Sequence, residues 1–577
     1  MRVASAAARL QVVLLSAILL AACSREAGAP AHAGADTVFL NGRIYTVDTQ
    51  RSWAEAVAIS ADRIIYVGTN DGARALAGTG TTVVDLRGRM MLPGFQDSHI
   101  HPVSGGVETG ICDLNGATGL TEYRSVIAAY AAANPGVPWV LGGGWLMSDF
   151  GPGGSPDKTI LDELVPDRPV FLSSSDGHTG WANSKALEIA GITRDTPDPI
   201  DGRIDRDPET GEPNGALHEG AQELVERHVP PTTDAAREAG LRYAVHMLNA
   251  LGITSVQEAR ADDEDYIRAY KVLESRGELS LRVVVSMLWD RKRGLEQVSD
   301  LAAMRDRYNA GGLVRPTTVK IFQDGVMENY TAAMLEPYLI PSGSRGIPKV
   351  EPELLKQAVT ALDAEGFQVH FHAIGDAAVR QALDAIEEAE ITNGGHGHRH
   401  HIAHLQMIDP ADIPRFGELD VVANFQPLWA YPDEYVTDLT IPFIGDERAR
   451  WMYPIRSVRD AGGLIAFGSD WSVSTPNVFH QIETAVTRMS AIGDRPGQTL
   501  NPQEAIDLAT AIDAFTINAA FVNKHEGETG SIEVGKLADL VVLDQNLFDI
   551  DSKALSETNV LLTVFGGKTV HGSYAGL

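Results

Sequence analysis

The sequence predicts an α/β protein built on a distorted (β/α)8 TIM barrel, with a small β-sandwich domain assembled from both termini. Two observations predict the barrel: apolar runs rich in β-branched residues alternate with helical stretches along the middle of the chain, and these runs number eight. Eight such units close into a barrel whose functional site lies at the carboxyl ends of the strands. A third observation predicts the sandwich: short strand-like runs separated by turn residues occur near both ends of the chain.

The first residues are typical of a bacterial export signal. Arg2 and Arg9 precede an apolar stretch over 10–20 that is too short to span a bilayer, and small residues follow it. The motif LAAC, which ends at Cys23, resembles the lipobox, whose cysteine becomes the lipid-modified first residue of a mature lipoprotein. We therefore expect a signal peptide over 1–22 and lipidation of Cys23, the alternative being a plain secretory signal.

The residues after this cysteine bear on location. Ser24 takes the place of the aspartate that commonly marks inner-membrane retention, so the lipobox resemblance implies an exported lipoprotein anchored to the bacterial outer membrane, on its periplasmic face. The residues 23–36 are rich in Ala, Gly and Pro and predict a tether. Once Cys23 carries lipid, Cys112 is the remaining cysteine, which excludes an intrachain disulfide and is typical of a small buried hydrophobe.

The remaining elements follow in order along the chain. Residues 37–92 are expected to form the N-terminal part of the sandwich, 93–525 the barrel, and 526–577 the C-terminal part of the sandwich. About residues 103–233 do not fit the βα repeat and predict a large insertion after the first barrel strand. The expected barrel strands are 91–101, 252–259, 281–288, 318–325, 367–376, 401–406, 421–427 and 464–471.

The charge balance limits the class of partner. The formal net charge is −30, from 47 Lys and Arg against 77 Asp and Glu. Such an acidic chain argues against a nucleic-acid backbone or an anionic membrane surface as the main partner. We expect a small-molecule substrate and membrane contact only through the lipid anchor; a homo-oligomer remains open.

Several predicted strands end in residues that can bind a metal. His99 and His101 stand one residue apart at the end of the first strand, so both side chains should face the barrel mouth. Two imidazoles aimed at one point suit a divalent cation. Other strand ends carry further metal-competent residues, namely Lys320, His372, His404 and Asp470. Agreement between these residues and strands assigned from hydrophobic pattern alone favours one metal site.

These residues and their surrounding motifs resemble the amidohydrolase superfamily, and within it amidohydrolase family 3. The resemblance rests on LPGFQDSHIHP (92–102), DGHTGWANSKAL (176–187), VKIFQDGVMENYTAAML (319–335), HAIGDAAV (372–379), RHHIAHLQ (399–406) and FGSDWSVSTPN (467–477). It implies the ligand set His99, His101, Lys320, His372, His404 and Asp470. It also implies two divalent cations, zinc being the first choice over manganese, iron or cobalt. Lys320 would be an N6-carboxylysine that bridges them, the alternative being a single metal beside an unmodified lysine.

The resemblance also implies a reaction. Two bound cations would generate a hydroxide nucleophile, and Asp470 would take its proton and pass it to the leaving nitrogen. The expected function is hydrolysis of a C–N bond in a non-peptide amide, N-acyl compound or carbamate. A deaminase or lactonase with the same site is the near alternative, and a non-catalytic periplasmic binding lipoprotein is a more distant one.

Motif positions suggest which residues contact the substrate. The expected substrate-binding residues are Trp145, His178, Trp181 and Asn183 from the insertion, and His370, Gln426, Trp429 and Trp471 from the barrel. For those of the insertion the alternative is core packing or a loop-stabilising hydrogen bond. An aromatic lining would favour a substrate with an apolar or aromatic part. Two departures from the family pattern leave the substrate open: Ala403 precedes the sixth-strand histidine, and the second strand ends in Gln257 and Glu258.

Overall fold

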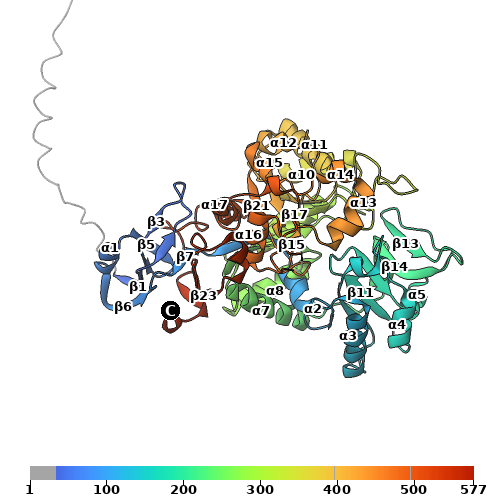
Figure 1. The fold of residues 1–577 in the computed structure, drawn as a ribbon, viewed down its shortest axis with the longest axis horizontal. Helices are drawn as coiled ribbons and strands as arrows, with labels where there is room; N and C mark the ends of the chain where they lie inside the picture. Colours follow the sequence, from blue (N-terminus) through green and yellow to red (C-terminus); the bar gives the residue numbers. More distant parts are fainter. Residues whose placement is uncertain (1–33, 396, 494) are drawn as a thin grey trace, which may run out of the picture.

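The computed structural model describes residues 34–395, 397–493 and 495–577, and its centre is an eight-stranded parallel barrel (Figure 1). The sheet order is β21-β20-β19-β18-β17-β16-β15-β8, which is the order of the chain. The prediction of a (β/α)8 barrel is confirmed, and each expected strand overlaps an observed one. The observed strands are β8 (Phe95–Ile100), β15 (Ile253–Ala261), β16 (Arg282–Leu288), β17 (Val314–Phe322), β18 (Gln368–Ala373), β19 (His401–His404), β20 (Val422–Phe425) and β21 (Ile465–Phe467).

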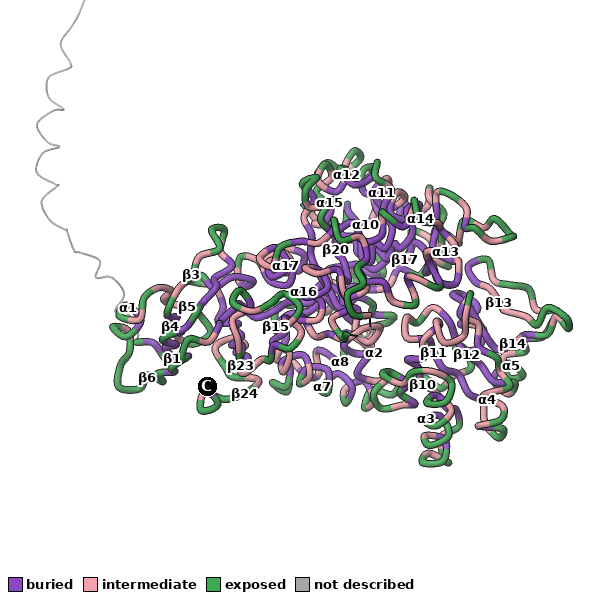
Figure 2. Tube along the Cα trace, in the orientation of Figure 1, coloured by how far each residue is buried: buried purple, intermediate pink, exposed green. Residues whose placement is uncertain are grey.

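Helices surround the barrel and bury one apolar face each against the strands. Figure 2 shows the buried strands at the centre and exposed helix surfaces outside them. The larger helices are α7 (Asp234–Ala250), α8 (Glu264–Ser275), α9 (Gln297–Tyr308), α10 (Pro352–Ala364), α11 (Asp376–Asn393) and α16 (Val478–Thr487). In α7, Thr233 accepts a hydrogen bond from the Ala236 amide, the usual way of satisfying a free N–H at a helix start. Part of the chain's folding energy therefore comes from these buried helix faces.

The first and last strands meet at the seam of the barrel. The Ser98 hydroxyl donates to the Phe467 carbonyl at 2.7 Å, and the Asp470 amide donates to the His99 carbonyl at 2.8 Å. A Cβ at Gly468 would lie 2.6 Å from the His99 backbone nitrogen, so only glycine permits this approach. The seam thus holds two of the predicted metal ligands in direct backbone contact.

Two sheets at one end of the molecule form the predicted sandwich (Figure 1). The first sheet has the order β5-β4-β1-β6, with β1 (Ala35–Leu40), β4 (Ala56–Ser60), β5 (Arg63–Gly68) and β6 (Ala77–Asp85). The second has the order β24-β23-β22-β7-β2-β3, with β2 (Arg43–Tyr45), β3 (Trp53–Ala54), β7 (Met90–Pro93), β22 (Leu540–Leu543), β23 (Val560–Phe565) and β24 (Lys568–Gly572). Side chains from both sheets share one apolar core, so the sandwich built from both termini is confirmed.

The insertion carries a sheet that the sequence did not predict. Its order is β13-β14-β12-β11-β10-β9, with β9 (Cys112–Asp113), β10 (Val140–Trp145), β11 (Val170–Ser174), β12 (Thr179–Ala182), β13 (Gly202–Arg206) and β14 (Pro213–Glu219). Helices α2 (Pro102–Glu108), α3 (Gly119–Ala133), α4 (Lys158–Leu164), α5 (Ser184–Ala190) and α6 (Glu223–Glu226) accompany it. This sheet lies at the end of the molecule opposite the sandwich (Figure 1). Within it Cys112 is a fully buried free thiol, and burial raises its pKa to about 12.

The N-terminal predictions fall mostly outside the described residues. The signal peptide over 1–22 and the lipidated Cys23 lie there entirely, and β1 begins at Ala35, within the range expected for the tether. Among the described helices, none has both the length and the apolar character needed to cross a bilayer.

Candidate functional site

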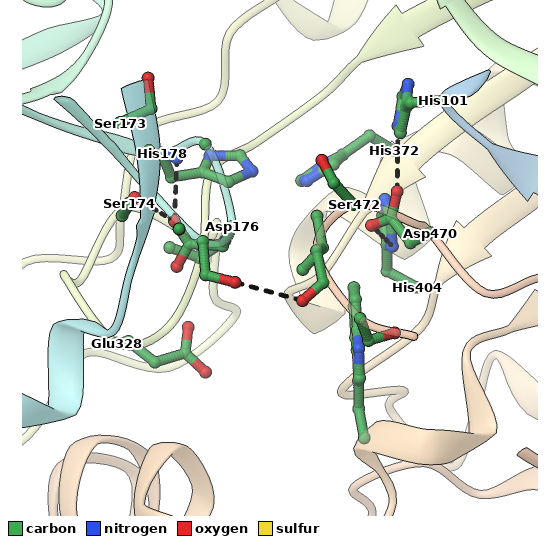
Figure 3. Close-up of a pocket in the computed structure, with 18 of the residues that line it drawn as sticks. His101, Ser173, Ser174, Asp176, His178, Glu328, His372, His404, Asp470 and Ser472 are labelled. Atoms are coloured by element: carbon green, nitrogen blue, oxygen red, sulfur yellow. Dashed lines mark hydrogen bonds and ion pairs between the residues drawn. The ribbon is translucent and has the colours of Figure 1, made fainter. Parts of the chain in front are cut away.

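The six predicted metal ligands gather at the carboxyl ends of five barrel strands. They comprise His99 in β8, His101 directly after it, Lys320 in β17, His372 in β18, His404 at the end of β19, and Asp470 after β21. All six line one cavity of about 1080 Å³. Donor atoms of His99, His404 and Asp470 lie within 4.8 Å of one another. Figure 3 shows His101, His372, His404 and Asp470 together on one side of this cavity.

Asp470 connects the histidines of this cluster. Its Oδ1 lies 3.3 Å from His99 Nε2 and 3.0 Å from His101 Nε2, and its Oδ2 lies 3.9 Å from His404 Nδ1. Burial alone would raise the pKa of Asp470, but the neighbouring His99 and His101 hold it well below its usual range. The carboxylate is therefore ionised at neutral pH. Both Asp470 (φ 55°) and His404 (φ 81°) have left-handed backbone conformations, which is strain of the kind that gathers at functional sites.

Two histidines of the cluster are oriented by partners behind them. His370 Nε2 lies 2.7 Å from His99 Nδ1, and the other nitrogen of His370 lies 3.0 Å from the Ser286 hydroxyl. His404 donates from Nδ1 to the Gln426 amide oxygen at 2.9 Å. These contacts occupy the Nδ1 atoms and leave Nε2 of both rings for a ligand, as outer partners do in metal sites. His370 and Gln426, expected to contact substrate, thus lie behind the cluster and position it.

The buried imidazoles are in the state that binds a metal. Burial lowers the pKa of His99 to about 3, and it also holds the pKa values of His372 and His404 well below the ordinary value. Neutral imidazole is the form that offers a lone pair to a cation.

Lys320 is fully buried, and no described residue forms a hydrogen bond with its Nζ. Burial lowers the pKa of this amine from 10.5 to about 7. His372 Nδ1 is likewise buried without a hydrogen bond within the described part of the chain. Buried polar atoms normally have partners, so two such atoms in one cavity fit a group that binds them. Imidazole and carboxylate donors fit a divalent cation, zinc foremost.

Sequence reasoning missed several residues that support this cluster. Asp324 accepts hydrogen bonds from the amides of Ala333, Ile374 and Gly375, and its Oδ1 lies 3.3 Å from His372 Nδ1. It therefore ties the loops after β17 and β18 together beside the predicted ligand His372. Its place near the end of the strand predicted over 318–325, within VKIFQDG, was the available signal.

A second missed group fixes His178, which lines the cavity as expected. Its Nδ1 lies 3.0 Å from Glu219 Oε1, and Lys349 Nζ lies 2.5 Å from Glu219 Oε2. Thr331 also donates to Glu219 at 2.7 Å. Glu219 is 41 residues from His178 in sequence, on β14, and no local pattern links the two.

The other expected substrate contacts divide into two sets. Trp429 lines the cavity and stacks on the His404 ring, with centroids 5.4 Å apart and planes 8° from parallel. Trp471 is not among the lining residues; its ring packs against Gly105 and its carbonyl accepts from the His101 amide at 2.9 Å. The Trp471 carbonyl thus fixes the backbone of the predicted ligand His101.

Three residues of the insertion do not reach the cavity. Trp145 and Trp181 are fully buried, and their indole N–H groups donate to the carbonyls of Leu172 and Asp157 at 2.9 and 3.0 Å. Asn183 is fully buried as well and caps α5. Their motif pointed toward substrate, but these side chains lie in the core of the insertion and we no longer expect them to contact substrate.

Comparison with known proteins agrees with this geometry. The model of a family described as "Amidohydrolase family" matches residues 82–571. The chain is 35% identical over 557 residues to Protein LONG AFTER FAR-RED 3 of Arabidopsis thaliana. This match covers 94% of this chain and 92% of that protein. It is 29% identical over 550 residues to an N-substituted formamide deformylase of Arthrobacter pascens, covering 92% and 97%.

Solved structures share the architecture. An uncharacterized metal-dependent hydrolase from Pyrococcus horikoshii superposes with a TM-score of 0.71 at 25% identity, covering 89% of this chain and 99% of that one. A zinc-bound adenosine deaminase from Xanthomonas campestris has a TM-score of 0.54 at 15% identity, with 93% of each chain covered, and shares the fold. The strand-end cluster, the barrel with its sandwich and the match over residues 82–571 together show that this chain belongs to the amidohydrolase family.

Proposed function

We propose that the protein is a metal-dependent amidohydrolase that cleaves a C–N bond, other than a peptide bond, in a small-molecule amide, N-acyl compound or carbamate. The observation that carries this proposal is the convergence of His99, His372, His404, Lys320 and Asp470 on one cavity, with buried donor atoms left without partners. The formamide deformylase, similar over 92% of this chain, acts by its name on a C–N bond. Two deaminases match shorter parts of the sequence, 14% and 38% of this chain, so sequence similarity favours amide hydrolysis over deamination.

The proposed cofactor is a pair of zinc ions, held by the histidines of the cluster together with Asp470 and Lys320. When bound, a divalent cation supplies a Lewis acid for the scissile carbonyl and lowers the pKa of a water molecule. Asp470, which is ionised, takes the proton of the attacking water at a carboxylate oxygen. It then gives that proton to the leaving nitrogen, which is base catalysis followed by acid catalysis.

Lys320 is proposed to be carboxylated. The low pKa leaves much of its amine neutral near pH 7, and a neutral amine can attack carbon dioxide. The new N–C bond forms as one C=O π bond of carbon dioxide opens and one proton leaves the nitrogen, and the product is a carbamate whose single negative charge is shared by two oxygens. These oxygens suit a buried position among metal ligands, where a free ammonium would be repelled.

Metal analysis and a substrate screen test the proposal together. Elemental analysis should find about two metal ions per chain, as in two-metal hydrolases, and intact mass should show an acid-labile excess of one carbon dioxide. The metal-loaded protein should hydrolyse N-formyl and N-acetyl amides and lose this activity with a chelator. Hydrolysis of lactones or release of ammonia from purines, without amide cleavage, would contradict the proposed reaction.

We also propose that the chain is exported and anchored to the outer membrane through Cys23. The lipobox motif supports this. Labelled palmitate should enter the full-length chain in a bacterial host, and a Cys23→Ala variant should remain unlabelled. Equal labelling of both would contradict the anchor.

A further inference from the structure

The charges lining the cavity are unevenly paired. Three of its basic side chains have carboxylate partners: Arg260 with Asp262, Arg291 with Glu223, and Lys349 with Glu219. The fourth, Lys320, belongs to the metal cluster. Several lining carboxylates have no basic side chain within ion-pair distance among the described residues, and Asp176 and Glu328 are two of them.

Glu328 is a buried carboxylate with one oxygen in use. It is 5% exposed, and its Oε1 accepts hydrogen bonds from Gln406 at 3.2 Å and Thr440 at 3.3 Å. None of the described side chains binds its Oε2. Burial raises the pKa of this carboxyl to about 7, which is the cost of holding a carboxylate here without a cation. A cationic ligand would remove that cost.

The two carboxylate oxygens of Asp176 also differ in their hydrogen bonds. Its Oδ1 accepts from the Ser174 hydroxyl at 2.5 Å and from the His178 amide at 2.9 Å, which stabilises the turn after β11. Its Oδ2 is buried and has no hydrogen-bond partner in the described part of the chain. Oδ1 therefore stabilises the turn, whereas Oδ2 makes no hydrogen bond with the described residues.

Aromatic rings complete this part of the lining. Tyr435 and Tyr453 line the same cavity, and burial raises both phenol pKa values well above the ordinary value. The charges of Glu328 and Asp433 also raise both pKa values, that of Asp176 raises the pKa of Tyr435, and all of these side chains line the same cavity. Carboxylates beside aromatic rings are the surroundings in which proteins hold organic cations.

The two acids lie across the cavity from the metal cluster. Figure 3 shows Asp176 and Glu328 on one side and His372, His404 and Asp470 on the other. A molecule whose scissile bond sits at the cluster would therefore extend its far end toward the acids.

We propose that Asp176 and Glu328 form a subsite for a cationic group of the substrate, an alkylammonium or amidinium several bonds from the scissile C–N bond. This inference rests on the proposed function for its orientation, because the cluster defines where the reacting bond lies. A substrate that occupies this subsite is an amide that carries a basic group at the end far from the scissile bond. The subsite also disfavours substrates with a free carboxylate at that end.

A pair of amides that differ in one charge tests the subsite. Monoacetylated diaminobutane carries a terminal ammonium, and N-pentylacetamide has a methyl group in its place. We expect the metal-loaded protein to favour the cationic amide at least about tenfold in kcat/KM, because a hydrogen bond between two charges exceeds a neutral contact by about that factor. Glu328→Gln and Asp176→Asn keep the oxygens that accept hydrogen bonds, so they should remove the preference and leave the neutral amide unaffected. Glu434→Gln is the matched control, since Glu434 lines the cavity but is ion-paired with Arg495.

A binding measurement separates this inference from the proposed function. Calorimetric titration with pentylammonium should show saturable binding that the Glu328→Gln variant weakens at least about tenfold and the Glu434→Gln variant leaves unchanged. Pentan-1-ol should bind no better to the wild type than to Glu328→Gln. If neither amide is hydrolysed, the proposed function fails while the titration still decides the subsite. Equal binding of pentylammonium by wild type and Glu328→Gln, or amide hydrolysis with no preference for the cation, would overturn the inference.

Discussion

Replacing Lys320 by methionine should raise the free energy of unfolding of the metal-free protein and lower that of the metal-loaded protein. In the absence of metal and carbon dioxide, Lys320 is a fully buried amine without a hydrogen-bond partner among the described residues. Methionine has a similar length and carries no charge, so it fits the same space without the desolvation cost. With metal bound, the same change removes a proposed ligand.

The size of the effect follows from the pKa. Lowering the pKa from 10.5 to about 7 corresponds to a penalty of about 5 kcal/mol, because one pH unit is worth about 1.4 kcal/mol. The folded-state pKa lies below the unfolded one, so the penalty is complete below pH 7 and is lost as the pH rises toward 10.5. At pH 9.5, one unit below 10.5, it should be about 1.4 kcal/mol.

Urea unfolding of chelator-treated protein in carbon dioxide-free buffer measures this difference at pH 7 and pH 9.5. The free energy of unfolding of Lys320→Met should exceed that of the wild type at pH 7, and the gap should shrink at pH 9.5. Lys349→Met is the matched control: Lys349 is buried but paired with Glu219, so its loss should destabilise by about 2 kcal/mol through a carboxylate left short of a partner. A gap between Lys320→Met and wild type that is equal at both pH values would refute the reasoning.

Three further variants test the site. Asp470→Asn should lower kcat about 10²- to 10⁴-fold while the protein stays folded, since it removes the proton carrier; steady-state kinetics on any accepted amide checks this, and full activity would exclude the role. Gln426→Leu should weaken metal affinity about 10- to 100-fold, because His404 loses the acceptor that orients it; a chelator competition assay measures this, and unchanged affinity would contradict it. Gly468→Ala should destabilise the protein by about 1–3 kcal/mol, because its Cβ would lie 2.6 Å from the first barrel strand. A thermal melt measures this, and Gly527→Ala is the control, since a Cβ there would have no atom within 4 Å and should change the melting temperature little.

The sequence was sufficient for the barrel and the cluster because both depend on local pattern. The β-branched runs locate the strands, and a ligand such as His404 or Asp470 stands where its run ends. Alternation along a strand then decides which side chains share a face. Asp324 shows the limit of that reasoning, since its position was visible but its three backbone amide partners come from two separate loops.

The cavity wall could not be derived in this way. His178 reaches the cavity, whereas Trp181, three residues later in the same motif, lies in the core of the insertion. Which face of such a sheet meets the barrel depends on packing between distant segments. The pairing of His178 with Glu219 and the free oxygens of Asp176 and Glu328 depend on the same long-range packing.

The barrel seam joins residues made early and late in synthesis. His99 and Asp470 meet through a backbone hydrogen bond, and the cluster between them draws on strands from the whole length of the barrel. A growing chain that has not yet produced β21 lacks Asp470, which follows it. The sandwich is incomplete until β22–β24, near the C-terminus, have been made. The full set of proposed ligands therefore exists only after synthesis is nearly complete, so a metal ion held by all of them can bind only to a nearly finished chain.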